Sequence, residues 1–179
     1  MRDRINAGAN CGLGAALVAL GSNLGDSAAI IRRAMERLRE FSDASVVCSS
    51  LWESAPVDCP PGSPKFINAA VRLIPRAGET PETLLAKLQK LEMEFGRRPK
   101  RVHNEARPLD LDLIAFGNQT RSSSALTLPH PRTCHRRFVL EPLSEVAGDF
   151  VLPGQGKTIR ELLAQLPDDS SVRRVGSAL

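Results

Sequence analysis

The order of strand-like and helical segments constrains the fold of this chain more than any other feature of its sequence. Apolar runs of strand length alternate with segments whose apolar residues recur at helical spacing. The strand-like runs cover residues 15–20, 44–52, 66–74 and 108–116, and the helical segments cover residues 27–41 and 81–95. This β-α-β-β-α-β order is that of a ferredoxin-like unit. We therefore expect an α+β fold in which a ferredoxin-like βαββαβ core with an antiparallel sheet carries extra C-terminal elements.

Capping residues support both helical segments. Thr80 is a good cap residue that is followed by a proline and an acid, and Gly96 closes the apolar stripe of that segment. Asp26 or Ser27 is suited to cap the first helix. The strand before that helix is expected to break at Gly21.

The last third of the chain adds short elements to this core. We expect a short apolar segment near residues 138–143, a short strand at residues 150–152 and a helix over residues 158–166. The run Gly154-Gln-Gly-Lys-Thr158 is similar to part of a P-loop, but Val151 stands where that motif requires its first glycine. We interpret the run as a turn with Thr158 as a helix cap.

Length and composition indicate one globular domain. The chain has 179 residues, of which 42% are apolar and 25% charged, as is ordinary for a protein with one hydrophobic core. We expect a flexible N-terminal extension over residues 1–14, a single domain over residues 15–166, and a polar, frayed tail over residues 167–179. The sequence shows neither a signal peptide nor a membrane-spanning run, so we expect a cytoplasmic protein with no membrane partner.

Charge and cysteine content exclude further classes. The net charge of +4 is modest and comes largely from two basic loops, which favours a local anionic site over a broad nucleic-acid surface. We therefore expect no nucleic-acid partner. The cysteines at positions 11, 48, 59 and 134 form no C-x-x-C pair, so no zinc or redox motif is present.

Two carboxylates, Asp110 and Asp112, stand in the otherwise apolar run of residues 108–116. Because strand side chains alternate, both project from the same face and repel each other unless a positive charge lies between them. A hard divalent cation such as Mg²⁺ would supply that charge through oxygen ligands. An edge strand with one solvated face is the alternative interpretation of the same pattern.

Basic segments flank this strand on both sides. Residues 96–107 hold five arginines and lysines, and residues 129–138 hold three arginines. All three histidines of the chain also lie in these two segments. A metal-type carboxylate pair between cationic loops suits a polyphosphate, since the metal bridges phosphate oxygens and the basic side chains neutralise the rest. Solvated surface loops are the alternative.

Several motifs resemble one enzyme family, 6-hydroxymethyl-7,8-dihydropterin pyrophosphokinase. They occur in family order as Ala19-Leu-Gly-Ser-Asn-Leu-Gly25, Pro64-Lys-Phe-Ile-Asn-Ala-Ala70, Arg107-Pro-Leu-Asp-Leu-Asp-Leu-Ile114, Phe116-Gly117 and Leu128-Pro-His-Pro131. The resemblance runs from about residue 15 to about residue 166. It implies a ferredoxin-like enzyme that moves the pyrophosphoryl group of ATP to the hydroxymethyl of a reduced pterin, releases AMP and serves folate synthesis.

The resemblance also implies roles for residues at the pterin end of the site. Phe66 and Phe138 match two rings that sandwich the pterin, although a core role is the usual one for such aromatics. Asn68 matches an amide that reads the polar edge of the pterin, for which its paired donor and acceptor are suited. Ser54 and Val57 match contacts from the proline-rich loop of residues 53–65.

At the nucleotide end, the resemblance implies that Asp110 and Asp112 bind two Mg²⁺ ions. Arg97 and Arg107 match catalytic and nucleotide-binding arginines of a mobile basic loop. Further nucleotide contacts are implied for Gln89, Glu92, Ile114, His130 and Arg136. The chain departs from the family at residues 104–106, where Asn-Glu-Ala replaces a frequent Trp-Gly-Pro run. The long loops at 53–65 and 96–108 are expected to close over bound substrates.

Two other functions remain open on the residues alone. A ferredoxin-like RNA-binding module would need aromatic residues on the sheet face, whereas this chain places two acids on one strand. A metal-dependent phosphohydrolase would use the same aspartates, and AMP release only in the presence of the pterin would separate transfer from hydrolysis. We expect ATP and a reduced pterin as the ligands of a monomeric enzyme.

Overall fold

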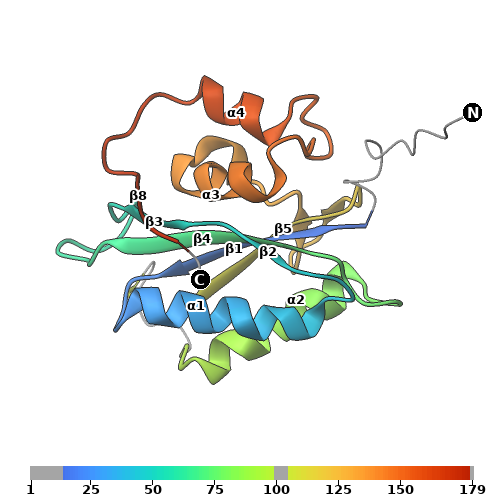
Figure 1. The fold of residues 1–179 in the computed structure, drawn as a ribbon, viewed down its shortest axis with the longest axis horizontal. Helices are drawn as coiled ribbons and strands as arrows, with labels where there is room; N and C mark the ends of the chain where they lie inside the picture. Colours follow the sequence, from blue (N-terminus) through green and yellow to red (C-terminus); the bar gives the residue numbers. More distant parts are fainter. Residues whose placement is uncertain (1–13, 99–104, 178–179) are drawn as a thin grey trace, which may run out of the picture.

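The computed structural model describes residues 14–98 and 105–177, and within these ranges the chain forms three layers (Figure 1). A central sheet separates two helical layers. Helices α1 (Ser27–Leu38) and α2 (Pro81–Glu94) cover one face, and α3 (Arg137–Ala147) and α4 (Ile159–Gln165) lie over the other. The α1 and α2 side is called the sealed face below, and the α3 and α4 side is called the open face.

The sheet has the strand order β5-β1-β4-β3-β8, and every pairing along it is antiparallel. Its strands are β1 (Ala16–Ser22), β2 (Val47–Cys48), β3 (Leu51–Ser54), β4 (Phe66–Leu73), β5 (Asp110–Phe116) and β8 (Arg173–Gly176), with β2 pairing β4. The first four strands of this order are those of the ferredoxin-like unit. The expected α+β fold with its ferredoxin-like antiparallel core is therefore confirmed.

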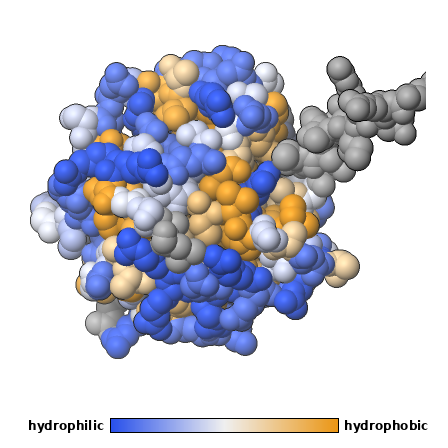
Figure 2. All heavy atoms as spheres, in the orientation of Figure 1, coloured by the Kyte–Doolittle hydropathy of each residue, from blue (hydrophilic) through white to orange (hydrophobic). Residues whose placement is uncertain are grey.

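Side-chain alternation explains why the strands read as nearly continuous apolar runs. On β1, Val18 and Leu20 pack with the helices of the sealed face, whereas Leu17 and Ala19 pack with those of the open face. Since both faces of this strand are covered, both sets of positions are apolar. The visible surface is mostly hydrophilic over the helices, and apolar residues gather at the level of the sheet (Figure 2).

The helix starts follow the capping residues seen in the sequence. The side chain of Asp26 accepts a hydrogen bond from the backbone N–H of Ala29, and Thr80 forms a capping box with Thr83 before α2. Thr158 caps α4 in the same way with Glu161. The interpretation of residues 154–158 as a turn and cap, rather than a P-loop, is confirmed.

Other expected elements differ from those observed. The 44–52 run is two strands, β2 and β3, because the ladder that both form with β4 is interrupted at Ser49 and Ser50. Strand β1 does not break at Gly21 but continues to Ser22. The apolar segment 138–143 is part of α3, whose buried residues recur at helical spacing. The expected strand 150–152 is a single bridge between Val151 and Thr158.

The largest difference lies at the C-terminus. Residues 173–176, expected in a frayed tail, form β8 and pair with β3 at the edge of the sheet. Their Arg-Arg-Val-Gly sequence has no apolar periodicity that would indicate a strand, so the pairing with β3 explains it. The expected N-terminal extension lies outside the described residues except for Gly14.

Smaller elements complete the described part of the chain. A hairpin of β6 (Arg121–Ser122) and β7 (Thr127–Leu128) follows β5. The short 3-10 helix η1 (Arg39–Phe41) follows α1, and a second one, η2 (Thr133–His135), precedes α3. Within residues 14–98 and 105–177, no helix is long and apolar enough to cross a membrane.

Candidate active site

Strand register brings the candidate residues together on the open face. Gly21 of β1 lies between Asn68 of β4 and Asp110 of β5, and Ala19 lies opposite Asp112. Because side chains two residues apart share a face, these positions form neighbouring rows on one surface. The expected placement of both aspartates on the same face of one strand follows from this register.

Small residues on the central strand leave room above these rows. A Cβ atom built on Gly21 would lie 3.8 Å from Oδ1 of Asn68 and from the Phe66 ring, and 3.9 Å from the Cβ of Asp110. These are ordinary contact distances, so even a methyl group would line the floor and a longer side chain would fill the space. Gly21 is therefore the floor of a pocket rather than a strained turn.

The pocket above Gly21 holds about 910 Å³ of empty space when its open mouth is included. It gathers candidate residues from β3, β4, β5, the start of α3 and both loops. Ten of the expected site residues line it: Ser54, Val57, Phe66, Asn68, Arg97, Arg107, Asp110, Asp112, Arg136 and Phe138.

The apolar end of the pocket holds both expected rings. Phe66 and Phe138 both line it, although they come from β4 and α3. Asn68 is only 6% exposed, and its side-chain N–H₂ donates to Oγ of Ser54 at 2.8 Å. This hydrogen bond fixes the orientation of the Asn68 amide at the edge of the pocket.

An arginine lies against each of these rings. The guanidinium carbon of Arg107 is 5.7 Å from the centre of the Phe66 ring, and that of Arg136 is 5.5 Å from the centre of the Phe138 ring. Both distances are within the range of a cation–π contact. The cationic and aromatic parts of the pocket are thus in direct contact rather than separate.

The carboxylate pair has a positive partner, as the repulsion argument required. Asp110 accepts from Arg97 at 2.6 Å through one oxygen and from Arg107 at 2.8 Å through the other. Burial raises the pKa of Asp112, and the neighbouring charge of Asp110 raises this pKa further. Burial also lowers the pKa of His130, against the opposing effect of Asp112.

Glu92 stands behind the pocket and holds one of these arginines. It is 6% exposed, pairs with Arg97 and accepts from the backbone N–H of Leu111 at 2.7 Å. Burial is the main cause that raises its pKa to about 7, with opposing effects from the Leu111 N–H and Arg97. In this structure Glu92 is therefore a support for Arg97.

The lining, as far as the chain is described, does not include four expected nucleotide contacts. Gln89 is exposed on α2, and Glu92 lies behind Arg97 as described above. The Ile114 side chain is buried in the core, and its carbonyl accepts from the backbone N–H of His130 at 3.0 Å. Their contacts with a nucleotide stay a prediction.

Arg132 and Cys59 are among the lining residues that did not follow from the sequence. Arg132 lies in the basic segment already noticed, but nothing in that segment distinguishes it from its neighbours. Cys59 lies in the proline-rich loop and belongs to no cysteine motif of the sequence. Residues 99–104, which include Lys100 and Asn104 of the basic loop, lie outside the described residues.

Comparison with known proteins identifies the family. Residues 17–148 match the family model described as 7,8-dihydro-6-hydroxymethylpterin-pyrophosphokinase (HPPK). A 2-amino-4-hydroxy-6-hydroxymethyldihydropteridine pyrophosphokinase of Haemophilus influenzae is 35% identical over 88% of this chain and 96% of that protein. The chain belongs to this family. The resemblance of the motifs and the assignment as a pyrophosphokinase are thereby confirmed.

Two further relatives are similar to this chain over most of its length. The pyrophosphokinase of Synechocystis is 38% identical over 84% of this chain and 75% of that protein. The folic acid synthesis protein fol1 of Pneumocystis carinii is 35% identical over 86% of this chain but only 20% of that much longer protein. Among solved structures, the wild-type HPPK-DHPS of Plasmodium falciparum with pteroate superimposes with a TM-score of 0.66 at 12% identity. That match covers 89% of this chain and 47% of that one, and it supports the fold alone.

Proposed function

We propose that this pocket transfers the pyrophosphoryl group of ATP to the hydroxymethyl of 6-hydroxymethyl-7,8-dihydropterin, with release of AMP, as a step of folate synthesis. The observation that carries the proposal is the convergence of two aromatic rings, a fixed amide, two carboxylates and several arginines on one pocket. A flat heterocycle and a polyphosphate need these two sets of groups side by side.

The pterin is assigned to the aromatic end. Phe66 and Phe138 stack on its two faces, Asn68 pairs with its polar edge, and Ser54 and Val57 contact it from the loop. A π-face on each side suits a flat heterocycle without a requirement for a particular substituent. The Ser54 hydroxyl keeps the amide of Asn68 in place for this recognition.

The carboxylates fit a magnesium site that the nucleotide completes. No group of three or more His, Cys, Asp or Glu side chains in the described part of the chain could hold a metal ion. Mg²⁺ is commonly held by one or two carboxylates together with substrate phosphates, so Asp110 and Asp112 suffice as protein ligands for two ions shared with ATP. Bound Mg²⁺ would neutralise charge on the transferred phosphates.

The arginines change partners in this scheme. Arg97 and Arg107 neutralise Asp110 in this structure, and a metal ion held by Asp110 would supply that positive charge in their place. Both guanidinium groups could then bind phosphate oxygens together with Arg136 and His130, with Arg97 still paired to Glu92. Catalysis rests on orientation and on charge stabilisation, which dominate phosphoryl-type transfer, and the scheme assigns no protein base to the hydroxymethyl group.

The test is AMP release from ATP and Mg²⁺ with and without the hydroxymethyl dihydropterin. Release that depends on the pterin, with formation of the pterin pyrophosphate, supports the proposal. Release of AMP or phosphate without the pterin would instead assign a phosphohydrolase. Salt-dependent RNA binding without ATP turnover would assign the RNA-binding module.

We also propose that the enzyme is a cytoplasmic monomer. Ten of the expected site residues meet on one pocket within a single chain, which supports a monomer. Analytical ultracentrifugation with and without nucleotide tests the oligomeric state, and a dimer under either condition would contradict the proposal.

A further inference from the structure

The C-terminal segment of residues 167–176 runs from the upper helical layer to the edge of the sheet (Figure 1). It leaves the end of α4, passes α3 and ends as β8 on the outer side of β3. It lies beyond the 17–148 range of the family match. We call residues 167–176 the C-terminal strap.

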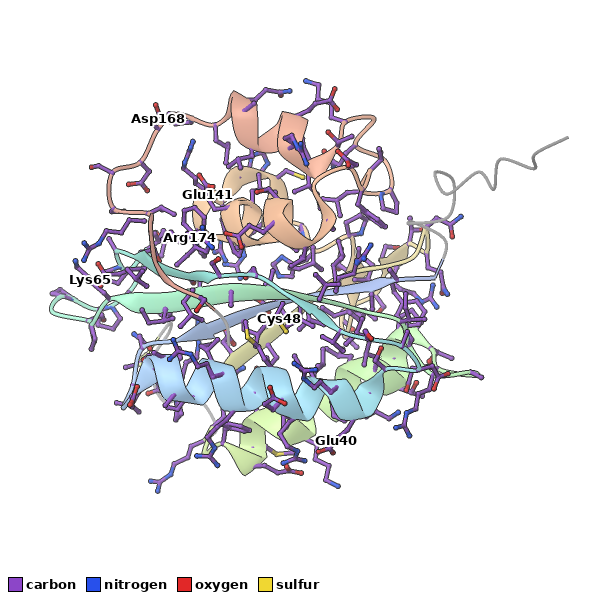
Figure 3. All side chains as sticks on the ribbon, in the orientation of Figure 1. Glu40, Cys48, Lys65, Glu141, Asp168 and Arg174 are labelled. Atoms are coloured by element: carbon purple, nitrogen blue, oxygen red, sulfur yellow. The ribbon has the colours of Figure 1, made fainter. Side chains whose placement is uncertain are left out.

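One end of the strap is attached beside the Phe138 wall of the pocket. Nη1 of Arg137 donates to the carbonyls of Leu166 at 3.3 Å and Pro167 at 3.2 Å, and Nη2 pairs with Asp168 at 3.3 Å. Arg137 is the first residue of α3 and stands immediately before Phe138. Figure 3 labels Asp168 on the strap and Glu141, another partner of Arg137, on α3 below it.

The other end is attached behind the Phe66 wall. Nε and Nη2 of Arg173 lie 2.9 and 2.8 Å from Oε1 of Glu53, and Nζ of Lys65 lies 2.9 Å from the same oxygen. Glu53 precedes Ser54 and Lys65 precedes Phe66, so this cluster joins both ends of the 55–65 loop. Figure 3 shows Lys65 at this loop and Arg174, the next residue of β8, near the sheet.

Helix α3 has a second attachment to the sheet, but it lies toward the other end of the helix. Glu145 accepts from the backbone N–H of Ser50 at 2.7 Å and from Nε1 of Trp52 at 2.9 Å. Arg137 and Glu145 are about 12 Å apart along the helix axis at 1.5 Å per residue. Leu140 and Leu143 are buried against the sheet, so the body of α3 keeps its place without Arg137. The first turn, which carries Phe138, could then shift relative to Phe66.

We propose that the C-terminal strap sets the width of the pterin slot, with Arg137 and Arg173 as positioning residues that hold its two walls. The inference rests on the proposed function, which places the pterin between Phe66 and Phe138. A ring bound between two rings needs a gap of about 7 Å, which is two contact distances of ~3.5 Å. A small change of that gap weakens stacking on both faces, whereas the phosphate site on β5 is not affected.

The experiment compares two neighbouring arginines of β8. Arg173→Gln breaks the contact with Glu53, and Arg174→Gln is the matched control, because Arg174 has the same charge but does not contact Glu53. Calorimetry measures the affinity for the hydroxymethyl dihydropterin in the presence of Mg²⁺ and an α,β-methylene ATP analogue. A second titration measures the affinity for the analogue alone.

We expect Arg173→Gln to weaken pterin binding about twofold to fivefold, the effect of one exposed ion pair. The double variant Arg137→Gln/Arg173→Gln should weaken it by about tenfold, since both ends of the strap are then released. Arg173→Lys should keep most of the wild-type pterin affinity, because lysine can still pair with Glu53. Arg174→Gln should bind both ligands as the wild type does, and affinity for the analogue should stay within about twofold in every variant.

Two results would overturn the inference. Pterin affinity unchanged in the double variant would show that the strap does not set the slot. An equal loss of pterin and nucleotide affinity would show a general structural role instead. Phe138→Ala is titrated in parallel: if it binds the pterin normally, the slot assignment has failed, whereas normal binding by the strap variants alone refutes only the strap.

Discussion

The sealed and open faces of the sheet differ most at the C-terminal half of β1 and the N-terminal half of β5. On the sealed face, Leu20, Leu111 and Leu113 are at most 4% exposed and pack beneath α1 and α2. On the open face, the intervening positions are Gly21, Asp110 and Asp112, which line the pocket. The same backbone therefore supports a close-packed core on one side and a polar cleft on the other. The side chains, not the strands, decide which face is functional.

This contrast explains how stability and activity are divided in the molecule. A change on the sealed face removes packing from a continuous core and should lower stability. A change on the open face removes a group that is held in place by the core but contributes little packing of its own. Pairs of substitutions at adjacent positions of one strand can therefore test the division directly.

The largest expected effect comes from Asp112 and Leu113, which are adjacent on β5 but face opposite sides. Asp112→Ala should reduce turnover by about a thousandfold, as the loss of one preorganised electrostatic group does. Its melting temperature should not fall, because the substitution relieves the repulsion with Asp110. Leu113→Ala should instead cost about 2–5 kcal/mol of stability and keep activity in the folded fraction. Near-normal turnover by Asp112→Ala with Mg²⁺ would contradict the metal assignment.

Glu92 links the two faces, because it lies on α2 of the sealed face but supports Arg97, which lines the pocket of the open face. Its folded pKa of about 7 lies above its unfolded value, so the folded state holds the extra proton between these values. Stability should therefore fall as pH rises from about 4.5 to about 7, by at most about 3 kcal/mol. Thermal melts of the ligand-free enzyme across this pH range should show a smaller fall in melting temperature for Glu92→Gln than for the wild type. Identical pH profiles would show that Glu92 ionises normally.

The next effect compares Phe138, assigned to the pocket, with Phe116 of the core. Phe138→Ala should weaken pterin binding by about 1–3 kcal/mol, the value of a base stacked on an aromatic ring, and leave nucleotide binding unchanged. Phe116→Ala, on the sealed face, should cost about 3–5 kcal/mol of stability without a selective loss of pterin affinity. Pterin titration and thermal melting of both variants measure the two effects. A large fall in melting temperature with unchanged pterin affinity for Phe138→Ala would show that Phe138 is a core residue and does not contact the pterin.

The sequence predicted the core of the fold because local patterns there agree with tertiary structure. Strand periodicity placed Asp110 and Asp112 on one face, and capping residues placed the starts of α2 and α4. Strand β8 could not be predicted in this way, since its Arg-Arg-Val-Gly sequence has no apolar period and only the edge of β3 makes it a strand. Helix α3 was missed because its apolar segment is short and contains Pro142, which removes a helical hydrogen bond.

The same distinction applies to the site. The family resemblance named Phe66, Asn68 and Phe138, and the period of two on β4 explains why Phe66 and Asn68 share one face. No sequence pattern showed that Arg97 and Arg107 would both pair with Asp110, since this contact depends on where these two residues lie relative to β5 in the fold. Arg132 was overlooked for a related reason. A run of basic residues does not reveal which of its members face the pocket.

Substitution of Arg132 has the smallest expected effect on ligand affinity, and it tests which basic residues at the rim of the pocket contact the phosphates. Arg132 lines the pocket, and its charge lowers the pKa values of both His130 and Arg136, so the three groups form one electrostatically coupled cluster. Arg132→Gln should weaken nucleotide binding by at most about 1 kcal/mol, because its side chain is exposed, and should leave pterin binding unchanged. It should also raise the pKa of His130, which NMR titration of the imidazole measures directly. Arg160→Gln, also on the open side but paired with Asp149 away from this pocket, is the control and should change neither quantity. If Arg132→Gln raises the His130 pKa but leaves nucleotide affinity intact, then Arg132 only adjusts the electrostatics of the cluster and does not contact the phosphates.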